Sequence, residues 1–358
     1  MKVIIWNTEG IKKAQALQEL LFLTHSYKPD ILFILETMVT DKHLQNILLR
    51  LGFVYYDFVP ATNHAGGIAV LWTSGSIHAS FLKKTNRTIH LLVHGTSTML
   101  SSIISGIYAP TQQKKKDSFW NLLLELNEIF DLPWCIIEDF NELANPSEKR
   151  EGINHPCTKY RRLNNFLYQS NAISLPVNGS LYTLKKRIHM HLIYERLDRA
   201  IVCKNWMEVY PELVMVHGVF VCSDHCPIVL TTQYLVQQSK HLSFRFQNFW
   251  CQYRRLDKIV ILQWQTSVSG TRMYKLMQKL KYVKLHVKGW SKCFFGNTRH
   301  KLAQNETKLK ILEDKLLIQP DSPRLSEWMN RLLRQREKLL MFNQKYCCLL
   351  YTSPSPRD

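Results

Sequence analysis

The stretch of the sequence that decides the fold is Trp134-Cys135-Ile136-Ile137-Glu138-Asp139-Phe140-Asn141. Its apolar first half predicts a buried strand, and an acidic and an amide residue follow where that strand ends. The same pattern recurs at Val3–Trp6, which is followed by Asn7, and at Ile31–Leu35, which is followed by Glu36. Strand ends are where side chains from distant segments converge, so the pattern predicts one site built from several strands.

Further polar residues extend this set along the chain. Tyr108 ends an apolar run, Asp198 lies within Glu195–Arg199, and Asp224-His225 precedes the apolar run Cys226–Leu230. Carboxylates, amides and one imidazole form an oxygen-rich set that suits Mg²⁺ or Mn²⁺ better than zinc. Such a cation can offset charge on a phosphodiester, and a carboxylate or histidine can take a proton from the attacking water.

The remaining patterns of the first 232 residues predict a mixed α and β region. Helical periodicity indicates helices over Ala14–Thr24 and Asp117–Phe130, and apolar runs indicate strands over Gly66–Trp72 and Thr98–Tyr108. Lys114–Lys116 is interpreted as a solvated loop, with contact to a phosphate as the alternative.

Taken together, these residues occur in a familiar order. The chain resembles the endonuclease/exonuclease/phosphatase superfamily, which includes DNase I-like nucleases and apurinic endonucleases. The matching strings cover about residues 1–232 and are Trp6-Asn7, Leu35-Glu36-Thr37, Gly66–Trp72, Tyr108-Ala109-Pro110, Asp139-Phe140-Asn141-Glu142, Glu195–Arg199 and Ser223–Ile228. The resemblance implies an α+β fold, a four-layer α/β/β/α sandwich in which two packed β-sheets are flanked by helices, with a C-terminal helical extension.

The strings around Asp139 and Asp198 look most like the endonuclease of plant LINE-type non-LTR retrotransposons. Phe244–Trp250, followed by Trp290 and Phe295-Gly296, resembles the segment that joins this endonuclease to a reverse transcriptase. The resemblance implies an enzyme that nicks DNA and leaves a 3′-hydroxyl to prime reverse transcription. The reverse transcriptase domain itself is absent from this sequence, so the chain is expected to be a fragment of the element's protein.

The resemblance also implies a role for each residue of the set. On the metal side, Glu36 would bind Mg²⁺ or Mn²⁺ directly, with Asn7 and Asp224 close to the metal and the phosphate.

On the catalytic side, Asp139 would orient or deprotonate the attacking water with the help of Asn141, and Tyr108 would hold the phosphate. His225 would contact the scissile phosphate, with Asp198 fixing its tautomer and orientation. Asp139 and His225 both remain candidates for the base.

Four positions depart from the family pattern. Glu138 stands where a glycine usually precedes Asp-Phe-Asn, and Glu9 where the plant elements have arginine. Glu151 takes the place of a second glycine, and Leu184 replaces a tryptophan after Thr183. An extra carboxylate beside Asp139 can repel a phosphate or raise a neighbour's pKa. The second interpretation is therefore a catalytically weak or inactive element-derived protein that binds nucleic acid.

The positive charge is concentrated in the last third of the chain. Residues 1–230 hold 23 basic and 20 acidic side chains, whereas residues 231–358 hold 24 basic and 8 acidic ones. We expect the basic third to contact DNA or RNA backbone, the alternative being a solvated lysine-rich surface.

This asymmetry and the periodicity predict four regions. They are an endonuclease/exonuclease/phosphatase-like domain over 1–232, a linker over 233–271, a basic helical connector over 272–347 and a tail over 348–358. The tail matches the translation of a sequencing-library adaptor and is expected to be an unstructured artefact.

Other classes fit less well. A phosphatase or a repair apurinic endonuclease of the same superfamily is the third interpretation. No apolar run has the roughly 18 residues of a membrane span, and the start does not match a signal peptide. The nine scattered cysteines include no zinc-type pairs and favour a reducing compartment. An intracellular, nuclear protein is expected.

Overall fold

The computed structural model describes residues 1–62, 66–73, 77–95, 100–152, 156, 158–188, 191–232, 246, 250–251, 253–294 and 298–351. The chain divides into two compact units. The first unit comprises Met1–Val236 together with Lys310–Leu325, and the second comprises Gln237–Leu309 and Ser326–Asp358. Among the described residues, the strands of the first unit form two six-stranded sheets and a smaller three-stranded one.

The first sheet contains the strand that begins the chain. Its order is β14 (Val214–His217), β15 (Ile228–Thr231), β1 (Lys2–Asn7), β2 (Ile31–Leu35), β4 (Ile68–Trp72) and β3 (Tyr55–Val59). Strands β1 and β2 run parallel, and the other neighbours are antiparallel. The parallel pair brings the carboxyl ends of β1 and β2 to the same edge.

The second sheet contains most of the stretch from Trp134 to Asn141 as one of its strands. Its order is β10 (Ala172–Ser174), β13 (Asp198–Cys203), β8 (Trp134–Asp139), β7 (Ser102–Tyr108), β6 (Thr88–Val93) and β5 (Ala79–Thr85). Only β7 and β8 are parallel among these paired neighbours. Each large sheet therefore has one parallel pair whose ends lie together.

The two sheets pack face to face, and the alternation of side chains along each strand explains how. In β8, Cys135 and Ile137 point into the core between the sheets, while Ile136 points outward beneath the helices. Successive side chains of a strand point to opposite faces, so a strand that is buried on both faces needs apolar residues on both. Gly106 in β7 leaves room for the ring of Phe33, because a Cβ there would lie 2.3 Å from it.

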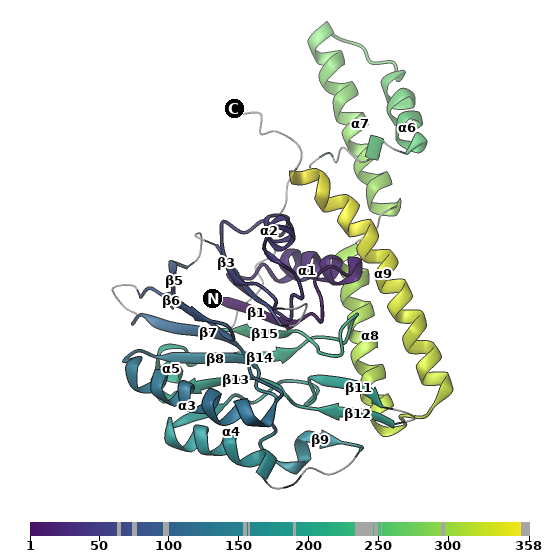
Figure 1. Cartoon of the computed structure of the whole chain (residues 1–358). Helices are drawn as coiled ribbons and strands as arrows, with labels where there is room; N and C mark the ends of the chain where they lie inside the picture. Colours follow the sequence, from purple (N-terminus) through teal and green to yellow (C-terminus); the bar gives the residue numbers. More distant parts are fainter. Residues whose placement is uncertain are drawn as a thin grey trace. The chain divides into compact units, whose positions relative to one another are not determined.

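Helices cover the outer faces of both sheets (Figure 1). The outer face of the second sheet is covered by α3 and α4, whose Trp120, Leu123 and Phe166 pack on Ile136 and Ile201. The helices of the first unit are α1 (Ala14–Tyr27), α2 (Asp41–Leu49), α3 (Gln113–Ile129), α4 (Thr158–Gln169), α5 (Lys204–Val209) and the short η1 (Pro146–Glu148). The result is the expected four-layer α/β/β/α sandwich.

The three-stranded sheet lies at one end of the first unit. It consists of β11 (Leu184–Ile188), β12 (His191–Glu195) and β9 (Lys149–Arg150), all antiparallel. Leu184 at the start of β11 also forms a bridge with His225, so this small sheet borders the predicted site.

The second unit is helical. It contains α6 (Arg254–Trp264), α7 (Arg272–Phe294), most of α9 (Pro323–Tyr351) and the first half of α8 (Thr298–Ile318). Helices α6 and α7 share a small core of Trp250, Leu256, Val287 and Trp290. Helix α6 occupies part of the range 233–271 assigned to a linker. Among the described helices, none combines the length and hydrophobicity needed to cross a membrane.

Two local predictions are wrong. The helix predicted from Asp117 begins at Gln113, because Lys114–Lys116 form its first turn and are not a solvated loop. Helix α9 continues to Tyr351, so the first residues of the tail 348–358 are helical, since nothing before Pro354 interrupts the helix. Residues 352–358 lie outside the described part of the chain.

Candidate active site

The two parallel strand pairs bring the predicted residues together. Strands β1 and β2 end side by side, with Asn7 opposite Leu35, so Glu36 follows directly beside Asn7. The Asn7 amide Nδ2 donates a 3.0 Å hydrogen bond to Glu36 Oε1. Glu36 has φ +46°, in the left-handed region that costs an ordinary residue roughly 1–2 kcal/mol. Such strain is concentrated at functional sites, where the surrounding structure holds it.

The second sheet contributes three residues through its register. Tyr108 at the end of β7 and Asp198 at the start of β13 both lie opposite Asp139, the last residue of β8. The Tyr108 hydroxyl hydrogen-bonds to Glu36, which links the edges of the two sheets. Burial, with the charge of Glu36, raises the pKa of Tyr108 well above its usual value of 10. Tyr108 therefore stays a neutral hydrogen-bond donor.

His225 completes the cluster from the segment before β15. Its Nδ1 lies 2.7 Å from Asp198 Oδ2, and its Nε2 lies 3.7 Å from Asp224 Oδ1. The Ser223 hydroxyl donates to the carbonyl of Asn7 at 2.8 Å and accepts the His225 N–H at 3.1 Å. Asp198 therefore fixes the ring of His225, and Ser223 ties this segment to β1.

Electrostatics separate the two candidates for the base. Burial raises the pKa of Asp139 to about 7, and the charge of Asp198 adds to this effect. Burial alone would lower the pKa of His225, but the charge and hydrogen bond of Asp198 outweigh it and raise that pKa well above 6.5. Asp198 therefore favours the protonated form of the His225 imidazole, and burial favours the protonated form of the Asp139 carboxyl.

Asn141 is positioned by its own backbone. Its N–H donates to Asp139 Oδ1 at 2.8 Å, its side chain donates to the carbonyl of Ala109 at 2.9 Å, and its φ is +50°. Lys116 is buried, and its ammonium donates to the Asn141 carbonyl at 2.7 Å and to Glu142 at 3.0 Å. Lys116 supports the loop that follows β8, which its sequence context did not indicate.

Three of the four departures adjoin site residues, and Leu184 does so through its bridge with His225. Glu9 interacts with Asp224, whose pKa is raised to about 6 by burial first and then, against the opposing charge of His225, by the charge and hydrogen bond of Glu9. Glu138 pairs through its backbone with Arg199 and Ile107 inside the second sheet. The acidic substitution at position 9 therefore acts directly on a residue of the site.

Some contributing residues were not identified from the sequence. The Thr183 hydroxyl accepts the N–H groups of Leu197 and Asp198 at 3.0 and 2.9 Å, which holds Asp198 in place. The guanidinium of Arg87 lies 5.5 Å from the centre of the Tyr108 ring. Arg87 lies in the turn between β5 and β6 and belongs to no motif, whereas Thr183 precedes Leu184, one of the departures from the family pattern.

The oxygen donors fit a hard divalent cation. Asp224 Oδ1 and Asp198 Oδ1 are buried and accept no hydrogen bond in the described structure, so each has lone pairs for a ligand. Among the described residues, Asp139, Asp198 and His225 also place their ligand atoms within 4.8 Å of one another. In that cluster, however, the ring nitrogen of His225 is already bonded to Asp198. Glu36, Asn7 and Asp224, which are expected from the sequence to lie at the metal, supply carboxylate and amide oxygens of the kind that Mg²⁺ prefers.

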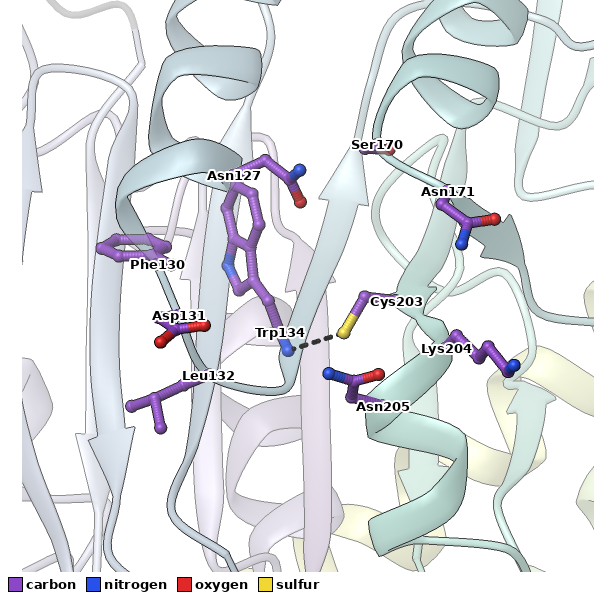
Figure 2. Close-up of a pocket in the computed structure, with 10 residues that line it drawn as sticks. All are labelled: Asn127, Phe130, Asp131, Leu132, Trp134, Ser170, Asn171, Cys203, Lys204 and Asn205. Atoms are coloured by element: carbon purple, nitrogen blue, oxygen red, sulfur yellow. Dashed lines mark hydrogen bonds between the residues drawn. The ribbon is translucent and has the colours of Figure 1, made fainter.

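A separate pocket lies at the opposite end of β8. Figure 2 shows its lining around Trp134, whose N–H donates to the sulfur of Cys203 at 3.1 Å. The pocket has a volume of about 180 Å³ and contains the carboxylate of Asp131 and the ammonium of Lys204. The eight residues predicted for the site lie elsewhere, so this pocket is not their site.

Comparison with known proteins places the fold. An AP endonuclease from Leishmania major aligns with a TM-score of 0.53 and 15% identity, covering 64% of this chain and 86% of that one. A 3′–5′ exonuclease from Neisseria meningitidis aligns at 0.51 and 19%, covering 65% and 100%. An AP endonuclease from Archaeoglobus fulgidus aligns at 0.51 and 18%, covering 64% and 98%. No protein-family model and no curated protein matches the chain. Two six-stranded sheets flanked by helices, with these solved structures as neighbours, show that the chain has a DNase I-like fold.

Proposed function

We propose that the chain is a metal-dependent phosphodiesterase that nicks DNA and leaves a 3′-hydroxyl. The observation that carries the proposal is the convergence of Glu36, Tyr108, Asp139 and His225 at the adjoining edges of two sheets. A buried cluster of carboxylates is costly unless its members are paired or bind a ligand, and such clusters are concentrated at functional sites.

Glu36, Asn7 and Asp224 would hold Mg²⁺ or Mn²⁺. When bound, the ion offsets negative charge on the phosphodiester and its leaving oxygen. Asp224 Oδ1, which is buried and accepts no hydrogen bond in the described structure, supports this assignment.

Four side chains supply the remaining chemistry. Asp139 takes the proton of the attacking water, because a pKa near 7 suits a general base at neutral pH. Asn141 holds Asp139 in position through its N–H. Protonated His225, fixed by Asp198, donates to a phosphate oxygen, and neutral Tyr108 donates to another. On this proposal Asp139, rather than His225, is the base.

Cationic residues beside the site would hold the DNA backbone. Arg87 and Lys115 line a groove of about 340 Å³ next to Tyr108. The basic third of the chain would add further contacts to DNA or RNA backbone. With DNA as its substrate, the protein would act in the nucleus, as the endonuclease part of a LINE-type element.

A nicking assay on supercoiled plasmid, with Mg²⁺ and with EDTA, tests the proposal. Asp139→Asn and His225→Ala should each lower the nicking rate by a factor of about 10²–10⁴, typical of losing an acid–base group. Asp131→Asn is the matched control, because it makes the same change at the far end of β8. Nicking that survives EDTA, or near-normal nicking by both site variants, would contradict the assignment. Preference for a plasmid carrying abasic sites would identify a repair activity instead.

A second candidate is a weak or inactive nucleic-acid-binding protein. The contact of Glu9 with Asp224 favours it, because an added carboxylate at the site repels phosphate. A wild-type chain that binds DNA but shows no metal-dependent nicking would support this alternative.

A further inference from the structure

Helix α8 contains a buried carboxylate that the proposed mechanism does not use. Glu313 is only 7% exposed and belongs to Lys310–Leu325, the segment of the C-terminal third that groups with the first unit. Its Oε1 accepts the backbone N–H of Phe220 at 3.3 Å. A carboxylate is costly to bury unless hydrogen bonds and opposite charges compensate it, so its contacts are informative.

Lys185 of β11 provides the compensating charge. It is the strongest opposing influence on the pKa of Glu313, which burial raises to about 7; Lys310 acts in the same direction, and Asp314 opposes it. The Lys185 ammonium also lies 5.9 Å from the ring centres of Phe220 and Tyr194. The ammonium therefore lies near two aromatic rings and interacts electrostatically with the Glu313 carboxylate.

Lys185 and Phe220 are both connected to Asp224 through the backbone. The backbone N–H of Lys185 donates to the Asp224 carbonyl at 2.8 Å. Phe220 lies four residues before Asp224 in a loop whose base is closed by the Gly218 N–H, which donates to the Pro227 carbonyl at 2.7 Å. Glu313 thus bonds to the backbone four residues before Asp224 and attracts the side chain of Lys185, whose own N–H bonds to the Asp224 carbonyl.

We propose that Glu313 is a positioning residue for the candidate active site. It holds the loop Phe220–Ser223 through the Phe220 N–H and attracts the Lys185 ammonium of β11 through its charge, and together these interactions fix the orientation of Asp224 beside His225. Glu313 touches no reacting group. The inference deepens the proposed function and rests on it, because the geometry of Asp224 matters for turnover only if the site is catalytic.

The test uses the full chain with Glu313→Ala, Glu313→Gln and, as the matched control, Asp314→Ala on the exposed face of the same helix. Hydrogen exchange of peptides covering 218–223 reports on the loop, and plasmid nicking with Mg²⁺ gives kcat and KM. Glu313→Ala should speed loop exchange at least tenfold and lower kcat about 10–100-fold, as is typical for residues that orient ligands. KM should stay within about threefold, because the substrate contacts remain.

The conservative variant separates positioning from folding. Glu313→Gln keeps an oxygen acceptor for the Phe220 N–H and should restore most of the exchange protection and of kcat, while Asp314→Ala should match the wild type. Unchanged exchange and kcat in Glu313→Ala, or equal losses in Gln and Ala, would overturn the proposal, and so would matching losses in Asp314→Ala.

Two further outcomes are decisive. If Glu313→Ala does not fold, Lys185→Met removes the other contact and should give the same losses; wild-type behaviour of that variant contradicts the proposal. If the wild-type chain never nicks DNA, the proposed function fails, and the exchange measurements still decide whether Glu313 holds the loop.

Discussion

Glu9 is the residue at which the site carries an added negative charge. It lies beside Asp224 and is 4.0 Å from the ammonium of Lys13, which compensates it only in part. We expect Glu9→Gln to lower the KM for plasmid DNA by about fivefold, because roughly 1 kcal/mol of repulsion toward phosphate is removed. Steady-state nicking kinetics check this. Lys13→Gln is the matched control and should raise KM. An unchanged KM in Glu9→Gln would show that Glu9 does not weaken DNA binding.

Glu151 shows what the loss of a glycine costs at one residue. Its φ is +63°, a conformation that suits the glycine found there in the family and strains an ordinary residue. Its side chain is exposed, so Glu151→Gly removes strain without opening a cavity. We expect the free energy of unfolding to rise by about 0.5–1 kcal/mol, measured by urea denaturation. Asn171→Gly, at φ +50°, should gain less, because asparagine tolerates this region.

His90 makes the stability of the fold depend on pH. Burial lowers its pKa to about 4, and its ring nitrogens lie 2.6 Å from Ser105 Oγ and 2.9 Å from Thr88 Oγ1. The folded state therefore keeps the ring neutral, while the unfolded state takes up a proton below about pH 6.5. Stability is lost as the pH falls from 6.5 to 4, by about 3 kcal/mol for this residue.

His90→Gln tests this by its pH slope rather than by its stability at one pH. Any packing cost of the substitution is measured at pH 7.5, where residue 90 is largely uncharged in both the folded and the unfolded state. Between pH 6 and 4.5 the variant should lose about 1.4 kcal/mol less per pH unit than the wild type. Parallel urea-denaturation profiles over that range would show that His90 is not the titrating group.

The sequence could predict which residues form a candidate site but only part of how they meet. The eight polar residues were found because each follows a strand or precedes one, and the parallel register of β7 with β8 then sets Tyr108 opposite Asp139. Arg87 and Lys116 could not be found in this way. Their roles depend on which turn and which helix happen to lie beside the site, and nothing in their neighbouring residues encodes that.

At the scale of elements, α7 is the most basic helix described. Its 23 residues include seven lysines and arginines and no acidic residue. Lys281, Lys284, Lys288 and Lys292 recur about once per turn and are exposed, at an axial spacing of about 5–6 Å. One face of α7 is therefore a continuous stripe of positive charge, whereas α8 contains Glu306, Glu313 and Asp314 among its lysines.

This stripe predicts a measurable salt dependence. Lys284→Ala with Lys288→Ala should weaken binding to duplex DNA and reduce the slope of log K against log salt by up to about 1.8, the value for two phosphate contacts. The matched control is Lys301→Ala with Lys308→Ala on α8, which removes the same charge from exposed positions. Equal slopes for the two double variants would show that α7 contributes net charge alone.

Element boundaries were predictable where periodicity was strong. The run Ile31–Leu35 matches β2, and the helical pattern from Arg272 matches α7. Strand β5 and helix α6 were not predicted from the sequence. The lysines of β5 face solvent at a sheet edge, and Leu256 is the one buried residue described in α6. An element with few buried residues carries little apolar pattern, and packing in the folded chain decides its conformation.

At the scale of the whole molecule, we expect the positive charge of the last third to affect KM and the positioning of Asp224 to affect kcat. The first 230 residues are close to neutral, so their DNA affinity should respond weakly to salt, whereas the last third supplies most of the positive charge. The same C-terminal third also provides Glu313, which acts on the loop before Asp224. Removing the C-terminal third therefore deletes two contributions at once, one to binding and one to turnover.

A comparison of the fragment 1–232 with full-length Glu313→Ala separates the contribution to binding from the contribution to turnover. If Lys310–Leu325 contributes to turnover through Glu313 alone, the two proteins should share a kcat about 10–100-fold below the wild type. Their KM values should differ: the fragment binds weakly with a shallow salt slope, while full-length Glu313→Ala keeps the wild-type slope. Circular dichroism confirms that the fragment is folded before the rates are compared. A fragment with wild-type kcat would show that the site is complete without helix α8, and that the buried Glu313 has no part in turnover.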